Sequence, residues 1–153
     1  MSLKSKIWGP IQDQLRQGSD PRGIARTCAA GVSLAVFPVL GATTALCVAV
    51  GIRFKLNQPI LQAINYLLYP VQILLIPVFL LAWTHLLGGT PITFDPQAIA
   101  HEFMTEPRLF FANYGMAGLR AIAIWIIVAP LLFFLVERSL LPVLTRAIKA
   151  KHV

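Results

Sequence analysis

Three long apolar runs, separated by short groups of charged residues, dominate the sequence. They cover Ile24–Ile52, Ile60–Leu87 and Leu119–Val136. The hydrocarbon core of a bilayer is about 30 Å thick and is crossed by about 20 helical residues. The pattern therefore predicts an all-α integral membrane protein.

The first run is interrupted at its middle by Phe37-Pro38-Val39-Leu40-Gly41. Proline removes a helical hydrogen bond and clashes with the preceding turn, so a helix should break here. As one straight helix the run would be about 43 Å long, which is too long for one upright span and too short for two. We therefore predict a broken, re-entrant hairpin at 24–52, with half-helices Ile24–Phe37 and Gly41–Ile52.

The other two runs predict two transmembrane helices. Residues 60–87 contain Pro70 and Pro77 and are interpreted as one long, tilted and kinked span. A second broken hairpin, with its break at Tyr69-Pro70, is the alternative. Residues 119–136 form the second span, which Glu137-Arg138 should end.

The remaining segments are more polar. Residues 1–20 form a cationic segment, and residues 137–153 form a cationic tail. The connection at 88–118 should carry short interfacial helices, because Asp95-Pro96 and Thr105-Glu106-Pro107 both combine a capping residue with a proline suited to a first helical turn. The helical membrane domain then extends over residues 21–136.

Composition supports a membrane protein and argues against nucleic-acid binding. The chain is 57% hydrophobic and 12% charged, whereas soluble domains have about 25% charged residues. The net charge of +7 comes from residues that flank apolar runs rather than from a basic face with interleaved aromatic residues. Cys28 and Cys47 lie inside the first run and are expected to pack as small hydrophobic residues. No motif for a metal, a cofactor or an established catalytic machinery is present, so we do not expect an enzyme.

Charge placement predicts the orientation. Lys and Arg are enriched in cytoplasmic loops, and here they gather before residue 27, at 53–55 and after residue 137. The 88–118 connection has Arg108 against Asp95, Glu102 and Glu106. If 24–52 turns back, every basic cluster lies on the cytoplasmic side with both termini, and the acidic connection lies alone outside.

The helix break provides the main candidate site. In a broken hairpin the N-terminus of the second half-helix points into the membrane, with free backbone N–H groups and a positive dipole end. Transporters place anionic groups of substrates at such ends. The candidate binding residues are those of the break and of a cationic collar at its mouth, which suits lipid phosphate or an anionic solute: Pro38, Gly41, Thr43, Thr44, Arg22, Arg26, Arg53, Lys55 and Asn57.

Three classes of function remain open. The first is a small transporter or a lipid- or anion-translocating protein with its polar path at Pro38–Gly41, which needs a homo-oligomer or another subunit to enclose a route. The second is a non-catalytic scaffold that packs other helices through small-residue faces, namely Ala25, Ala29 and Ser33, and Gly41, Ala45 and Ala49. The third and least supported is an enzyme acting on lipid headgroups through His101-Glu102. In all three the surrounding partners are membrane lipids.

The first half of the chain resembles a bacterial membrane family catalogued as domain of unknown function 2062. The shared pattern, over about Gly18–Leu87, is a Gly-x-x-Pro start, an Ile-Ala pair, spaced small residues, a Pro-x-x-Gly break and a basic-x-Asn segment. Here these are Gly18-Ser19-Asp20-Pro21, Ile24-Ala25, Ala29 and Gly31, Pro38-Val39-Leu40-Gly41, and Lys55-Leu56-Asn57. The chain departs from the pattern at Thr27, Ala35 and Tyr69. The resemblance implies a multi-pass helical protein of the bacterial inner membrane, and it implies no particular activity.

Overall fold

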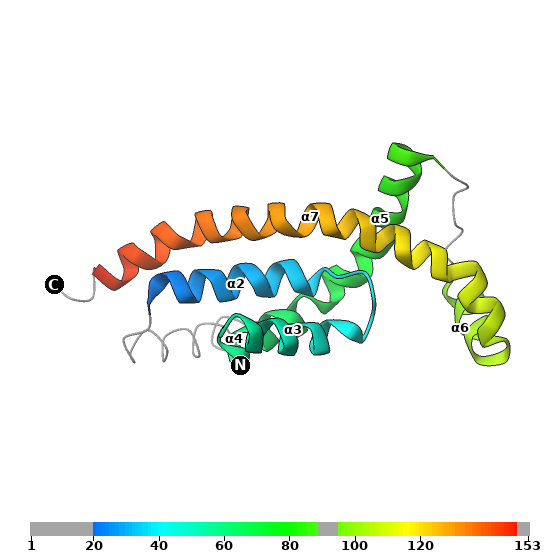
Figure 1. The fold of residues 1–153 in the computed structure, drawn as a ribbon, viewed down its shortest axis with the longest axis horizontal. Helices are drawn as coiled ribbons and strands as arrows, with labels where there is room; N and C mark the ends of the chain where they lie inside the picture. Colours follow the sequence, from blue (N-terminus) through cyan, green and yellow to red (C-terminus); the bar gives the residue numbers. More distant parts are fainter. Residues whose placement is uncertain (1–19, 89–94, 150–153) are drawn as a thin grey trace.

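The computed structural model describes residues 20–88 and 95–149, and in this part of the chain the regular secondary structure is all helical, without strands. The predicted all-α fold is therefore confirmed. The cationic segment before Asp20, Phe94 of the connection, and the end of the tail with Lys151 lie outside the described residues. The helices, labelled as in Figure 1, are α2 (Pro21–Ala35), α3 (Ala42–Arg53), α4 (Gln58–Leu67), α5 (Tyr69–Leu87), α6 (Pro96–Thr105) and α7 (Pro107–Lys149).

The first apolar run forms two helices separated by a break, as its sequence predicts. Asp20 caps α2, since its Oδ1 accepts a hydrogen bond from the Arg22 N–H at 3.1 Å. The helix ends at Ala35, because Pro38 has no N–H to donate and disfavours a helical conformation at the preceding residue. Gly41 then takes a φ of +82°, a left-handed conformation that glycine adopts without cost, and α3 begins after it. The chain reverses, and α3 runs back towards the end of the molecule where α2 starts (Figure 1).

The second apolar run is divided at Leu68 into α4 and α5. Asn57 caps α4 through its Oδ1, which accepts from the Ile60 N–H at 3.0 Å. The Leu68 N–H still bonds to the Ile64 carbonyl, and the Gln72 N–H bonds to the Leu68 carbonyl, so the helical hydrogen bonds continue past the division. Residues 60–87 therefore do not form the one continuous helix that the kinked span predicted, and they do not form a second hairpin at Tyr69-Pro70 either. The chain bends where Pro70 lacks its N–H, and it does not fold back.

The third run lies within one helix, α7, whose 43 residues correspond to about 64 Å. Two boundary predictions are wrong here. The helix that begins at Pro107 is not a short interfacial helix, because it continues as α7 through the third run. Glu137-Arg138 does not end this helix, which continues to Lys149. Charged residues are good helix formers, so a change from apolar to charged composition ends an apolar face without ending a helix. Asp95 caps α6 as predicted, with its Oδ1 accepting from the Gln97 N–H at 3.0 Å.

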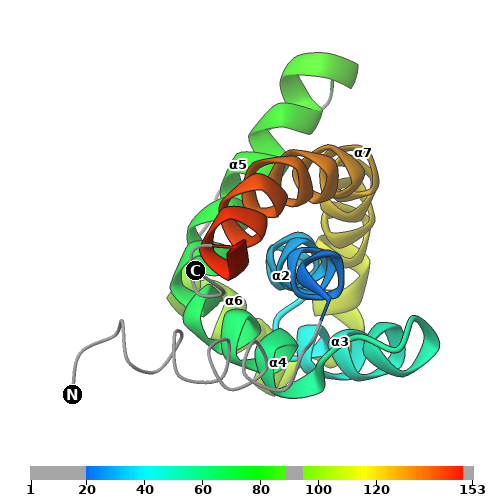
Figure 2. The same cartoon turned by 90° about the vertical axis from the view of Figure 1, so that its left-hand side faces the viewer.

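Helix α2 is the centre of the bundle. In Figure 2, which looks nearly along it, α7 lies on one side and α3 and α4 lie on the other. Ten of its fifteen residues are buried. Its small residues are covered within the chain, since Ala25 and Ala29 are 0% exposed and Ala25 packs with Ile60 of α4 and Leu144 of α7. Gly31 meets Ile64 so closely that an added Cβ would lie 3.1 Å from it.

The two small-residue faces therefore have different environments. The α2 face packs against α4 and α7, whereas Gly41, Ala45 and Ala49 of α3 are exposed in the single chain. The hairpin itself is joined by other residues, with Ala30 and Leu34 of α2 packing with Cys47 of α3 and Leu61 of α4.

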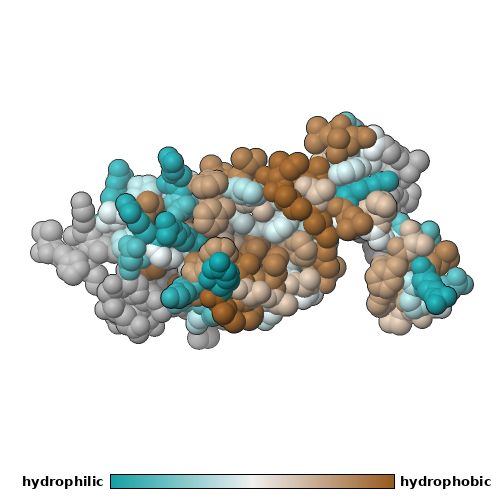
Figure 3. All heavy atoms as spheres, in the orientation of Figure 1, coloured by the Kyte–Doolittle hydropathy of each residue, from teal (hydrophilic) through white to brown (hydrophobic). Residues whose placement is uncertain are grey.

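Two helices are long and apolar enough to cross a membrane, namely α5 and most of α7. Their apolar windows are only 17% buried within the chain. In Figure 3 the hydrophobic colour covers the middle of the molecule, and hydrophilic residues gather at the end where α2 starts and α7 finishes.

Candidate functional site

The predicted site residues fall into two groups that lie at opposite ends of the hairpin. The break carries Pro38 and Thr43, which are buried, Thr44, which is partly buried, and Gly41, which is exposed. The other end carries the basic residues and Asn57. The structure therefore does not bring all nine residues to one site.

At the break, the chain satisfies the backbone with side chains from other helices. Gln72 of α5, 1% exposed, donates its Nε2 hydrogens to the carbonyls of Phe37 at 2.6 Å and Val39 at 3.4 Å. Trp125 of α7 donates its indole N–H to the Ser33 carbonyl at 2.9 Å, and its ring meets that of Phe37 edge to face. Carbonyls at the end of α2 and in the break are thus bonded by side chains of two other helices, which stabilises the hairpin tip.

A row of amide side chains follows from this tip along α5 and α4. We call Gln58, Gln62, Asn65 and Gln72 the amide row. Gln58 donates to the Val48 carbonyl at 3.1 Å, Gln62 to the Thr44 carbonyl at 3.4 Å, and Asn65 to the Thr44 hydroxyl at 3.3 Å. The row therefore binds α3 along its length.

Three oxygens of the amide row have no partner among the described residues. They are Oε1 of Gln58, Gln62 and Gln72, and all three are buried. Leaving a buried acceptor unsatisfied costs about 1–3 kcal/mol. The row therefore keeps hydrogen-bonding capacity beside α3 and the break that the described residues do not use.

The basic residues lie at the end of the bundle where α2 begins and α3 ends. Arg26 pairs with Glu137 of α7, with 3.2 Å between Nε and Oε1. The guanidinium of Arg53 lies 5.5 Å from the centre of the Phe54 ring. Arg22 and Lys55 are exposed. The predicted collar is thus a set of exposed cations at one end of the molecule, and Glu137 is an acidic partner of Arg26 that the sequence did not indicate.

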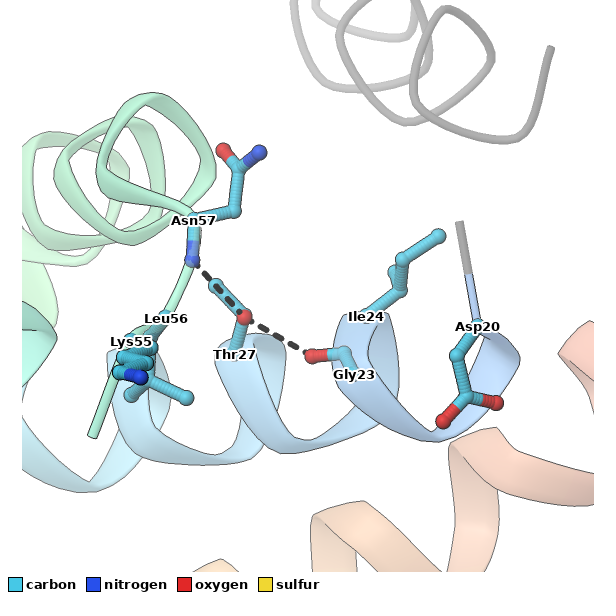
Figure 4. Close-up of a pocket in the computed structure, with 7 residues that line it drawn as sticks. All are labelled: Asp20, Gly23, Ile24, Thr27, Lys55, Leu56 and Asn57. Atoms are coloured by element: carbon cyan, nitrogen blue, oxygen red, sulfur yellow. Dashed lines mark hydrogen bonds between the residues drawn. The ribbon is translucent and has the colours of Figure 1, made fainter. Parts of the chain in front are cut away.

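A cavity of about 220 Å³ opens between the start of α2 and the connection from α3 to α4. We call it the polar cavity (Figure 4), and it is lined by Asp20, Gly23, Ile24, Thr27, Lys55, Leu56 and Asn57. The buried Thr27 hydroxyl fixes two of its walls, since it donates to the Gly23 carbonyl at 2.9 Å and accepts from the Asn57 N–H at 3.3 Å. Most of these residues belong to the segments that carry the family resemblance, Gly18–Ala25 and Lys55–Asn57.

Lys55 holds an unusual backbone conformation at the edge of this cavity. Its φ is +53°, and it is the one non-glycine residue with positive φ in the described part of the chain. The Leu56 N–H bonds to the Gly51 carbonyl at 2.9 Å and the Lys55 N–H to the Ile52 carbonyl at 3.4 Å, which is a Schellman ending of α3. Glycine is usual at this position, and a lysine there costs about 1–2 kcal/mol. Strain of this kind clusters at binding sites.

A second, apolar cavity of about 530 Å³ lies on the neighbouring face of α2. We call it the apolar groove. It is bounded by α2, α3 and α7 and is lined by Arg26, Ala30, Ser33, Leu34, Val50, Phe54, Leu56, Phe133, Phe134 and Glu137. Leu56 lines both cavities, so the groove adjoins the polar cavity. The Arg26–Glu137 pair is its charged boundary.

The two residues of the enzyme hypothesis are neighbours on α6. His101 of α6 is exposed, and Glu102 accepts a hydrogen bond from Asn113 at 2.6 Å. Within the described residues no group of His, Cys, Asp and Glu is arranged to hold a metal ion.

The sequence did contain a signal for the amide row. Residues 58, 62, 65 and 72 are separated by four, three and seven positions, which places them on one helical face of an otherwise apolar run. The apolar groove had no such signal, because its lining comes from three helices far apart in the sequence.

Comparison with protein families matches residues 9–151 to a family described as an uncharacterized protein conserved in bacteria, domain of unknown function 2062. The resemblance is thus confirmed, and it extends well beyond the first half of the chain. Comparison with curated proteins and with solved structures found no match.

Proposed function

We propose that this chain, which belongs to the bacterial family domain of unknown function 2062, is a multi-pass inner-membrane protein that translocates a lipid or an anionic solute. In this proposal α2 and α3 enter from the cytoplasmic side and return to it. Helix α5 and the apolar part of α7 cross the bilayer, and α6 lies outside. Both termini are cytoplasmic.

The exposed apolar surface supports the membrane placement. Large side chains along α5 and α7 are mostly open in the chain, among them Leu74 at 71%, Ile127 at 64% and Leu131 at 67% exposure. Soluble monomers rarely expose contiguous apolar patches larger than a few hundred Å². A lipid environment removes this cost.

The positions of the charges support the re-entrant hairpin. Arg26 contacts Glu137, which brings the start of α2 beside the charged part of α7. The end of α3 lies beside the start of α2, because Asn57 bonds to Thr27. The basic residues at 22–26, 53–55 and 138–146 therefore share one end of the molecule, as a common cytoplasmic side requires.

The observation that carries the translocation proposal is the amide row. Its three unpartnered oxygens belong to α4 and α5, on side chains that bond to α3 and to the Pro38–Gly41 break. A polar headgroup or solute passing along α3 would find acceptors at successive turns, in a region where lipid supplies none. The polar path is thus extended from the break alone to the whole length between α3 and α4.

Gln62→Leu tests this path. It removes the unpartnered Oε1 and also the long bond of 3.4 Å from Nε2 to the Thr44 carbonyl, so we expect the free energy of unfolding to fall by no more than about 1 kcal/mol. We expect the rate at which the purified protein moves a fluorescent phospholipid analogue across liposomes to fall about fivefold, equivalent to one hydrogen bond of about 1 kcal/mol. Gln97→Leu, at an exposed position of α6, is the matched control. Equal rates for both variants and the unaltered protein would remove the amide row from the path.

The exposed small-residue face of α3 favours a second candidate, a non-catalytic scaffold. Gly41, Ala45 and Ala49 are exposed in the single chain, and small residues let helices approach closely in lipid. Cysteines at Ala45 or Ala49, in a chain lacking Cys28 and Cys47, test for a homo-oligomer or another subunit. Efficient cross-linking together with absent lipid movement would favour the scaffold.

A further inference from the structure

The polar cavity holds two opposite charges that are not paired with each other. Asp20 lies at the start of α2, and Lys55 lies on the connection that passes Thr27. The ion pair found in the described part of the chain is Arg26–Glu137, and neither Asp20 nor Lys55 takes part in it. A cavity that presents a carboxylate and an ammonium separately is complementary to a zwitterion.

The two charges come from different walls of the polar cavity, Asp20 from the start of α2 and Lys55 from the connection between α3 and α4. One small ligand that contacts both walls must carry a cationic group for Asp20 and an anionic group for Lys55. A phosphoethanolamine unit carries both, with its ammonium and its phosphate joined by two carbon atoms.

The apolar groove indicates that the ligand also carries a chain. It adjoins the polar cavity at Leu56 and follows α2 from Arg26 towards Leu34, that is, from the charged end towards the hairpin tip. Its volume of about 530 Å³ suits one extended hydrocarbon chain. Polar and apolar parts thus follow each other along α2 in the same order as the parts of a phospholipid that enters a membrane from its surface.

We propose that the polar cavity and the apolar groove together hold one phospholipid with a phosphoethanolamine headgroup. Asp20 accepts hydrogen bonds from the ammonium, Lys55 binds the phosphate, and the groove takes one acyl chain. This inference rests on the proposed function, because it names the lipid that stands at the cytoplasmic start of the path. The left-handed conformation of Lys55 then has a role, because it keeps a lysine, where a helix end usually has glycine, in the lining of the cavity.

Gly23 offers a direct way to fill the polar cavity. A Cβ placed on it would meet nothing within 4 Å, so a larger side chain enters open space rather than the core. Gly23→Leu should therefore keep the fold, and it replaces a poor helix former by a good one. Gly115→Leu in α7 is the control, since a Cβ there also meets nothing within 4 Å. Asp20→Asn provides a second variant that removes the charge and keeps the helix cap.

The experiment measures lipid retained by the full-length purified protein, by native mass spectrometry after exposure to defined detergent–lipid mixtures. We expect phosphatidylethanolamine to be retained about tenfold better than phosphatidylglycerol or phosphatidylcholine, because only the first presents ammonium N–H groups to Asp20. Asp20→Asn should abolish the preference, Gly23→Leu should abolish retention, and Gly115→Leu should change neither. Soluble O-phosphoethanolamine should not displace the lipid.

Two results would overturn the proposal. One is equal retention of the three lipids by the unaltered protein. The other is undiminished retention by Gly23→Leu in a folded protein. Complete displacement by soluble O-phosphoethanolamine would overturn the role of the groove. If retention shows no headgroup preference while lipid movement in liposomes persists, this inference fails and the proposed function stands.

Discussion

Helices α2 and α5 both come from long apolar runs, yet they meet opposite environments. Ten of the fifteen residues of α2 are buried by other helices, whereas three of the nineteen residues of α5 are. Alanine, glycine and serine are frequent where α2 packs, whereas leucine and other large apolar residues prevail in α5, which is the more hydrophobic of the two helices. Small residues let backbones approach, and large apolar residues suit contact with lipid. The helix inside this bundle is therefore the one with the smaller and less hydrophobic side chains, and the helix on the outside is the more hydrophobic one.

The polar residues of α5 also differ between its buried and its exposed positions. Where α5 does bury a residue near its start, that residue is Gln72, whose amide holds the hairpin tip. Its exposed positions are mostly apolar. A bundle that keeps amides inside and leucines outside is arranged as the proposed bilayer placement requires.

The largest expected effect concerns topology. In a chain lacking Cys28 and Cys47, a single cysteine at Lys55 should resist a membrane-impermeant thiol reagent in intact cells, because the proposed topology returns the end of α3 to the cytoplasmic side. A cysteine at Gln97 of α6 should react fully. Labelling after the cells are opened shows that both sites are reactive in themselves. Reaction at position 55 in intact cells would mean that residues 24–52 cross the membrane.

The next largest expected effect is a difference in stability between substitutions on the small-residue face of α2 and on that of α3. Ala29→Leu forces a large side chain into a position that is 0% exposed, and we expect the free energy of unfolding in mixed micelles to fall by about 2 kcal/mol. Ala45 lies on the exposed face of α3, so Ala45→Leu should change the free energy of unfolding by less than about 0.5 kcal/mol. Denaturant titration followed by tryptophan fluorescence measures both. A comparable loss for Ala45→Leu would show that this face is buried against another chain.

The smallest effect concerns the strained end of α3. Lys55→Gly relieves a left-handed conformation that costs about 1–2 kcal/mol but adds chain entropy of about 0.5–1 kcal/mol to the unfolded state, so we expect a net gain of about 0.5 kcal/mol. Arg53→Gly, within the last turn of the helix, should instead lose about 1 kcal/mol. Denaturant titration followed by tryptophan fluorescence measures the free energy of unfolding of both variants. A loss for Lys55→Gly as large as that for Arg53→Gly would show that the lysine side chain stabilises the fold itself.

Local signals in the sequence predicted several helix boundaries. Asp95 caps α6 and Pro38 and Gly41 separate α2 from α3, as expected. Asp20 and Asn57 cap α2 and α4 through their side chains in the same way. These features depend on neighbouring residues, because caps and breaks are decided within one turn of chain. The end of α7 was mispredicted for the complementary reason, since Glu137 and Arg138 change the polarity of the chain without opposing its helical conformation.

The sequence by itself thus determined an all-helical chain, its hairpin break and the sign of charge near each apolar run. Tertiary structure decided which faces meet: that Gln72 reaches the Phe37 carbonyl 35 residues away, that Arg26 pairs with Glu137, and that Asp20 and Lys55 line one cavity. The physical reason is that helix formation depends on hydrogen bonds over four residues, whereas the cavities depend on how separate helices pack around α2. The polar cavity and the apolar groove exist only because α2 is enclosed by helices from the rest of the chain.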